Sequence, residues 1–253
     1  MILWLVSIAG AVLFAWPLFG LALPPDLPVM AALIAALLAL SAIEFQSRRL
    51  DSRKLALLAV IVGVDSALRL MLVMGIAGFS PVFFLVLCAG YIFGSAYGFL
   101  CGATVLLGSA LVTGGIGPWL PYEMLAAAWC GAIAGLAGKM FRIHKTDRVA
   151  IAVLAAVAIV TGFLYGAVMD LWDWTILRSG PGLGPAPGEP VSTQLSHFWH
   201  FYLSTSILWD SFRAFGTAFM IIVIGRAVLA GLQRSNRRFS LIIEPPVQEL
   251  ADH

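Results

Sequence analysis

Residues 149–171, VAIAVLAAVAIVTGFLYGAVMDL, form an apolar stretch in which Asp170 is the one charged residue. Because a helix needs about 20 apolar residues to cross the hydrocarbon core of a bilayer, this stretch predicts a membrane-spanning helix. Further apolar stretches are bounded by proline, glycine or charged residues, and they predict spans at 2–23, 30–46, 54–75, 80–94, 96–113, 119–138 and 200–226. The predicted fold is therefore an all-α integral membrane protein with about eight transmembrane helices.

The composition agrees with a bilayer as the solvent. Of the 253 residues, 61% are hydrophobic and 11% are charged, and the mean hydropathy is +0.97. A soluble domain has about 45–50% apolar and about 25% charged residues. These values argue against a cytosolic enzyme, a secreted disulfide scaffold, a nucleic-acid binder and a disordered regulator. The cysteines Cys88, Cys101 and Cys130 lie in apolar stretches without a CxxC spacing, which predicts buried thiols and no metal site.

Lysine and arginine predict the orientation. Three basic clusters, at 48–54, 139–148 and 226–238, hold twelve of the 15 basic residues. With eight spans, all three clusters fall on the same side, and the positive-inside rule makes that side the cytoplasm. We therefore predict a multi-pass protein of the plasma membrane with both termini in the cytoplasm.

Aromatic side chains gather at the segments predicted to lie outside. They are Phe79, Trp119, Tyr122, Trp172, Trp174, Trp199 and Tyr202, with His197 and His200 among them. Tryptophan and tyrosine favour the membrane boundary, so an aromatic belt is one interpretation. A ligand pocket walled by rings is the other. The two histidines are interpreted as residues of the boundary and not as metal ligands.

Four charged residues fall inside predicted spans. Asp65 and Arg69 are four residues apart, and Asp210 and Arg213 are three apart, so each pair shares a helix face and can form an ion pair. Charges at bilayer depth are costly unless they are paired or face the interior of the bundle. Two interpretations stay open: ion pairs that hold spans together, or a polar floor beneath a substrate site or gate. Asp170 ends a predicted span, where the helix dipole disfavours a carboxylate.

Small residues recur every four positions on two predicted helices. The stripes are Ala59, Gly63 and Ala67 in the span 54–75, and Ala158, Gly162 and Gly166 in the span 149–171. Small residues let helices approach closely in a membrane, so packing within the chain is the first interpretation. For the stripe at 59–67, docking onto a separate membrane partner is the competing one.

Motifs for catalysis are not found in the sequence. The nearest approach to a P-loop, GAIAGLAGKM at 131–140, has Ile133 in place of the first glycine and Met140 after Lys139. HExxH and GxSxG motifs do not occur. We therefore predict a chain that has no catalytic residues, binds no cofactor and does not hydrolyse ATP by itself.

Four stretches carry a resemblance to a known family. They are AGFSPVFFLVLCAGYIFGSAYGFLCGA at 77–103, GGIGPWLPYEMLAAAWCGAIAGLAG at 114–138, YGAVMDLWDW at 165–174 and FYLSTSILWDSFRAFGTA at 201–218. Together they resemble the substrate-binding S component of energy-coupling factor (ECF) vitamin transporters, of the cobalamin or riboflavin type. The resemblance implies a six-helix core at 51–238, preceded by two extra N-terminal helices at 1–50 and followed by a cytoplasmic tail at 239–253.

The resemblance also implies a function. Such a subunit captures a vitamin at the extracellular face and docks on a transmembrane coupling protein, the T component, which is carried by two ABC-type ATPases. Cobalamin is the favoured vitamin and riboflavin the next. The docking residues would be Ala59, Gly63 and Ala67. The substrate-binding residues would be Phe79, Trp119, Tyr122, Asp170, Trp172, Trp199 and Tyr202.

This chain departs from the family at Asp170 and Thr217, where relatives often have asparagine. If Asp170 contacts the cargo, the ligand differs in charge or hydrogen bonding. A rival hypothesis is a self-contained membrane protein, either an ion-coupled permease or a lipid enzyme. It would use Asp65, Arg69, Asp210 and Arg213 as a relay.

Overall fold

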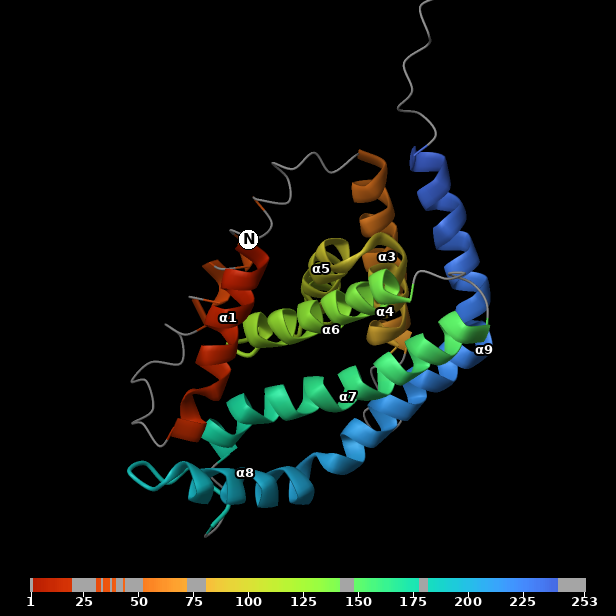
Figure 1. The fold of residues 1–253 in the computed structure, drawn as a ribbon. Helices are drawn as coiled ribbons and strands as arrows, with labels where there is room; N and C mark the ends of the chain where they lie inside the picture. The colour runs from red at the N-terminus through yellow and green to blue at the C-terminus, as the bar shows by residue number, and fades with distance from the viewer. Residues whose placement is uncertain are drawn as a thin grey trace, which may run out of the picture.

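The computed structural model describes residues 2–19, 31–32, 34–36, 38–39, 43, 52–71, 81–141, 148–177 and 182–240. In these residues the regular secondary structure is helical, as predicted (Figure 1). The elements are α1 (Ile2–Ala15), η1 (Trp16–Phe19), α3 (Ser52–Met71), α4 (Val82–Phe93), α5 (Ser95–Thr113), α6 (Leu120–Met140), α7 (Arg148–Leu177), α8 (Val191–Thr205) and α9 (Ile207–Ser240).

Four of these helices, α5, α6, α7 and α9, are long and apolar enough to cross a membrane. Two apolar helical segments, Trp4–Phe19 and Val82–Phe93, are shorter. The helix α3 has 20 residues but carries Arg53, Lys54, Asp65 and Arg69 along its length. The described residues thus have the character of a helical membrane protein. The predicted span 30–46 lies mostly outside the described residues.

Glycines with positive φ end two helices at points where the chain changes direction. Gly94 has a φ of 96° and separates α4 from α5, so the predicted spans 80–94 and 96–113 correspond to two helices. Gly114 has a φ of 72° and caps the C-terminus of α5. Both conformations suit glycine because it lacks a Cβ atom.

The region between α7 and α9 is more helical than predicted. The helix α7 continues to Leu177, about two turns beyond Asp170, so the dipole of its last turn no longer bears on that carboxylate. A second helix, α8, starts directly after Pro190, because VSTQLSH has no helix breaker. The predicted span 200–226 is therefore the end of α8, a break at Ser206 and then α9, which continues to Ser240.

Glycines bring α4, α5 and α6 into backbone contact. A Cβ atom on Gly98 of α5 would overlap the carbonyl oxygen of Gly131 on α6, and a Cβ on Gly131 would overlap the carbonyl of Gly98. Gly90 of α4 meets the same Gly131 carbonyl, and Gly102 meets the carbonyl of Ala127. Close approach of this kind allows apolar helices to associate tightly in a membrane. The three cysteines are buried free thiols, as predicted.

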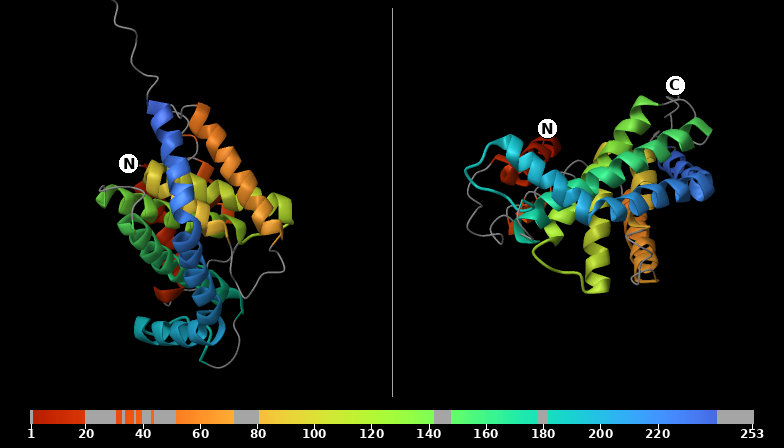
Figure 2. Two further views of the ribbon diagram at one scale, coloured as in Figure 1. Left: turned by 90° about the vertical axis from the view of Figure 1, so that its right-hand side faces the viewer. Right: turned by 90° about the horizontal axis from the view of Figure 1, so that it is seen from below.

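The small-residue stripe on α7 packs against α9 within the chain, as predicted. A Cβ on Gly162 would lie 2.6 Å from the Cα atom of Ala214, and Ala158 is buried. The first part of α9 lies alongside α7, and α9 then bends away from α7 (Figures 1 and 2).

The first helix packs against α5 and α6 in a second hydrophobic cluster. Gly10 of α1 lies so close to α6 that a Cβ atom there would overlap the side chain of Leu125. One turn later, Phe14 is buried and its ring meets Tyr122 edge-on with 5.3 Å between centroids. The opposite face of α1 is apolar and exposed, as shown by Ile8 and Val12. Lipid is the natural environment for such a face.

Candidate functional site

A buried ion pair lies where α8 meets the start of α9. Arg213 pairs with Oδ1 of Asp210, and the Tyr202 hydroxyl donates a hydrogen bond to Oδ2 at 2.9 Å. The Asp210 carboxylate fills the space that a side chain at Gly166 would need. The Arg213 guanidinium carbon lies 5.1 Å from the centre of the Tyr165 ring, which adds a cation–π contact. Each atom of the Asp210 carboxylate is therefore partnered.

Tyr202 links this pair to α8. Its side chain is buried. Two effects raise the pKa of Tyr202 above its ordinary value: burial, which is the larger, and the hydrogen bond to Asp210. The hydroxyl therefore keeps its proton and acts as a donor to the carboxylate.

Asp170 of α7 lies at the same junction. The Ser206 hydroxyl donates a hydrogen bond of 2.8 Å to Oδ1 of Asp170. The other oxygen, Oδ2, is buried and has no hydrogen-bond partner. Thus Asp170 and Asp210 differ: Asp210 has a cation and a hydroxyl donor, whereas Asp170 has only one neutral donor.

Two groups of rings flank these carboxylates. We call the first the α6–α7 ring cluster: Trp172 lies 5.7 Å from Tyr122 and 6.5 Å from Trp119, between centroids, and Phe14 of α1 closes it. The second is the α7–α8 ring cluster: Trp174 contacts Phe198, and both Phe198 and Trp199 stack on Tyr202.

Exposure differs within both clusters. Trp119 and Trp199 have exposed rings, whereas Tyr122, Trp174 and Tyr202 are buried. The indole nitrogen of Trp172 is buried without a hydrogen-bond partner, which leaves a free donor beside the rings. Each cluster thus runs from an exposed indole to a buried polar aromatic side chain.

The predicted ion pair between Asp65 and Arg69 of α3 does not form in the described structure. Arg69 donates a hydrogen bond of 2.8 Å to the Ser109 hydroxyl on α5, because its long side chain reaches the neighbouring helix. Asp65 is fully buried, and neither of its carboxylate oxygens has a hydrogen-bond partner. Glu123, in the first turn of α6, lies within electrostatic range of both Arg69 and Arg213.

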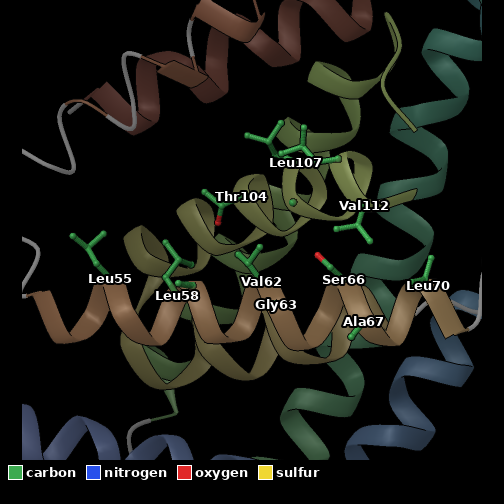
Figure 3. Close-up of a pocket in the computed structure, with 13 residues that line it drawn as sticks. Leu55, Leu58, Val62, Gly63, Ser66, Ala67, Leu70, Thr104, Leu107 and Val112 are labelled. Atoms are coloured by element: carbon green, nitrogen blue, oxygen red, sulfur yellow. The ribbon is translucent and has the colours of Figure 1, made fainter. Parts of the chain in front are cut away.

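The stripe on α3 is on the surface. Ala59, Gly63 and Ala67 are all exposed in the described structure, and a Cβ atom on Gly63 would meet nothing within 4 Å. With Leu107 and Gly108 of α5 they line an apolar groove of about 720 Å³ (Figure 3). One polar group in it, the Ser66 hydroxyl, is buried and has no hydrogen-bond partner.

Several of the residues predicted for the substrate site lie together in the structure. Trp119, Tyr122 and Trp172 share the first ring cluster, while Trp199 and Tyr202 share the second. Asp170 contacts Ser206, four residues after Tyr202. Phe79 lies outside the described residues.

Sequence reasoning missed Phe14, Tyr165 and Ser206 as members of the site. Ser206 is within the family-like stretch 201–218 but is not distinctive as a residue type. The sequence does not indicate a role for Phe14, because a single aromatic residue in an apolar helix can face either the protein or the lipid. Tyr165 could have been suspected from its position one residue before Gly166.

The described residues contain no group of three or more histidine, cysteine, aspartate or glutamate side chains that could hold a metal ion. His197 instead lies 3.0 Å from the carbonyl oxygen of Gly184, through Nδ1. Comparison with known proteins finds no family model that matches this chain and no curated protein or solved structure that is similar to it.

Proposed function

We propose that this chain is the substrate-capture subunit of an ATP-driven ECF-type importer. It would bind a vitamin, with cobalamin favoured and riboflavin next, and would perform no chemistry itself. The rings and the polar groups around Asp170 would hold the cargo. A coupling protein in the membrane, with two ATPases, would supply the energy.

The observation that carries this proposal is the separation of two surfaces. Rings and carboxylates gather where the start of α6, the end of α7 and α8 meet, whereas the open apolar groove lies between α3 and α5. A flat conjugated ligand suits the first surface, because aromatic rings bury area by stacking. A helix with small residues on its face suits the second. Capture and docking can therefore use different parts of one chain.

The distribution of basic residues supports an extracellular position for the rings. Lys54 is at the start of α3, where its carbonyl accepts a hydrogen bond of 3.2 Å from the Tyr97 hydroxyl at the start of α5. Lys139 is in the last turn of α6, and Arg148 is the first residue of α7. These residues lie at helix ends opposite to those that carry the ring clusters. With the basic ends in the cytoplasm, as the positive-inside rule predicts, the rings would lie outside.

Binding to the purified protein tests capture. In nanodiscs the chain should bind one equivalent of cyanocobalamin or riboflavin, measured by isothermal titration, and should not alter the ligand. Trp172→Ala should weaken binding about fivefold or more, since a stacked ring contributes on the order of 1 kcal/mol or more. The matched control is Trp4→Ala, on an exposed ring remote from the site. Absence of binding of either vitamin would contradict the proposal.

Docking is tested by co-purification. Gly63→Leu fills the groove and should remove the coupling protein and its ATPases from the purified complex, while vitamin binding is unchanged. Gly231→Leu on α9 is the control, because a Cβ there meets only the end of Arg234 at 4.0 Å. Retention of the partner proteins by Gly63→Leu would exclude this groove as the docking surface.

One observation favours the rival function, an ion-coupled permease. Asp65 is a fully buried carboxyl without a hydrogen-bond partner, and such groups inside membranes often carry protons or ions. A permease predicts uptake into liposomes that contain this chain alone, driven by a proton gradient and abolished by Asp65→Asn. If the chain is a capture subunit, neither the wild type nor Asp65→Asn should support uptake into such liposomes.

A further inference from the structure

Asp170 is a buried acid without an ion-pair partner among the described residues. Its side chain is 6% exposed, and Oδ2 is buried without a hydrogen-bond partner. In the described part of the chain, no lysine or arginine forms an ion pair with it. Burying a carboxylate costs free energy unless hydrogen bonds or a counter-charge replace the lost water.

The nearby Arg213 forms no ion pair with Asp170. Its guanidinium pairs with Asp210 and lies over the Tyr165 ring. Tyr202 likewise donates its one hydroxyl proton to Asp210. The donor that Asp170 does have, the Ser206 hydroxyl, contacts only Oδ1. One acceptor therefore stays open beside a fully satisfied neighbour.

Two hydroxyl groups lie beside Asp170, on the side of Oδ1. Thr205 is exposed, and its hydroxyl lies 2.9 Å from the Ser206 hydroxyl, which in turn contacts Asp170. Thr205 is the last residue of α8, and Ser206 is the one residue between α8 and α9. The open oxygen thus belongs to a carboxyl group at the junction of α8 and α9, where Ser206 holds its other oxygen.

We propose that Oδ2 of Asp170 accepts a hydrogen bond from an N–H group of the cargo, so that the site selects ligands with an amide, imide or amine nitrogen at this position. This inference rests on the proposed function and specifies the ligand chemistry of the same site. Ligands that present a carboxylate there are rejected, because two buried anions would face each other. In the free protein Oδ2 has no hydrogen-bond partner, and the bound cargo would supply one.

The test compares riboflavin with N3-methylriboflavin, and cyanocobalamin with its monocarboxylic acid derivatives, in which one side-chain amide is an acid. Isothermal titration is done on the wild-type chain, on Asp170→Asn, and on Asp173→Asn as a matched carboxylate control from the same helix. For whichever vitamin binds, the wild type should lose about 10- to 100-fold in affinity for the altered ligand, or for at least one acid isomer. Asp170→Asn keeps an acceptor oxygen but loses the negative charge, so it should bind the parent vitamin about tenfold more weakly and should reject the carboxylic acid isomers less than the wild type does. Asp173→Asn should behave as the wild type.

Thermal unfolding without ligand separates a ligand-binding role from a structural one. If the cargo completes Asp170, Asp170→Asn leaves the melting temperature of the free protein unchanged or raises it. A lower melting temperature with unchanged affinity would assign Asp170 to the structure and overturn the inference. Equal discrimination by the wild type and the variant would also overturn it, while vitamin binding itself would still support the proposed function. If the wild type binds neither vitamin, both proposals fail together. The wild-type comparison of ligands stands even if the variant does not fold.

Discussion

Gly166 of α7 and Asp210 of α9 face each other so closely that a Cβ atom on the glycine would overlap the carboxylate. The absent side chain makes room for a charge. Because the carboxylate occupies this space, it can meet Arg213 and Tyr202 at once. The small-residue stripe on α7 therefore does more than bring two helices together.

Gly166→Ala should displace the Asp210 carboxylate and weaken the contact between α7 and α9. Overpacking of a well-filled interior costs about 1–3 kcal/mol, so the melting temperature in detergent should fall clearly. Gly63→Ala is the control, since nothing lies within 4 Å of a Cβ atom there and alanine favours the helix. Equal melting temperatures for Gly166→Ala and the wild type would show that the carboxylate has room to move.

Asp210→Asn alone should destabilise the protein more than the double variant that removes the charges of both Asp210 and Arg213. The variant leaves Arg213 in the bundle without its anion, and breaking a buried pair from one side costs about 3–5 kcal/mol. The double variant Asp210→Asn with Arg213→Gln removes the unpaired charge and should recover much of this loss. Chemical unfolding of the two single variants and the double variant measures the coupling. Additive effects of the two substitutions would mean that the pair contributes nothing.

The helices and the α7 stripe were predictable because their signals are local. Apolar stretches bounded by Gly94 and Gly114 define α4, α5 and their ends, and Ala158, Gly162 and Gly166 recur at helical spacing. The helix α8 was not predicted, because its polar residues give no span and the preceding prolines and glycines suggest a loop.

The contacts of the site depend on tertiary structure and could be predicted only in part. Asp210 and Arg213 pair within one helix, which the spacing of three residues allows. Arg69 contacts Ser109 on another helix, and no spacing within α3 can indicate this. The link from Ser206 to Asp170 joins residues 36 apart and depends on how α8 and α9 fold back on α7.

Phe14→Ala should loosen α1 from α6. The Phe14 ring is 4% exposed and contacts both Tyr122 and Trp129, so its removal leaves a cavity that costs about 3–5 kcal/mol in a tightly packed interior. The control is Val12→Ala on the exposed face of the same helix. Limited proteolysis of the N-terminal region and thermal unfolding measure the effect. If both variants behave alike, α1 is an appendage and not a part of the core.

Tyr202→Phe should remove the hydroxyl that Asp210 accepts and lower the stability by about 0.5–3 kcal/mol at neutral pH. Since burial and the Asp210 contact raise the pKa of Tyr202 above its ordinary value of 10.0, the hydroxyl in the folded protein stays protonated where a free tyrosine ionises. The unfolded chain therefore releases a proton first as the pH rises, so the advantage of the wild type over Tyr202→Phe is fully present below about pH 10 and declines above it. Unfolding of the two proteins at pH 7, 9 and 10.5 measures this difference. A difference that grows with pH would mean that the ionised hydroxyl is favoured in the folded state and that Tyr202 does not act as a donor to Asp210.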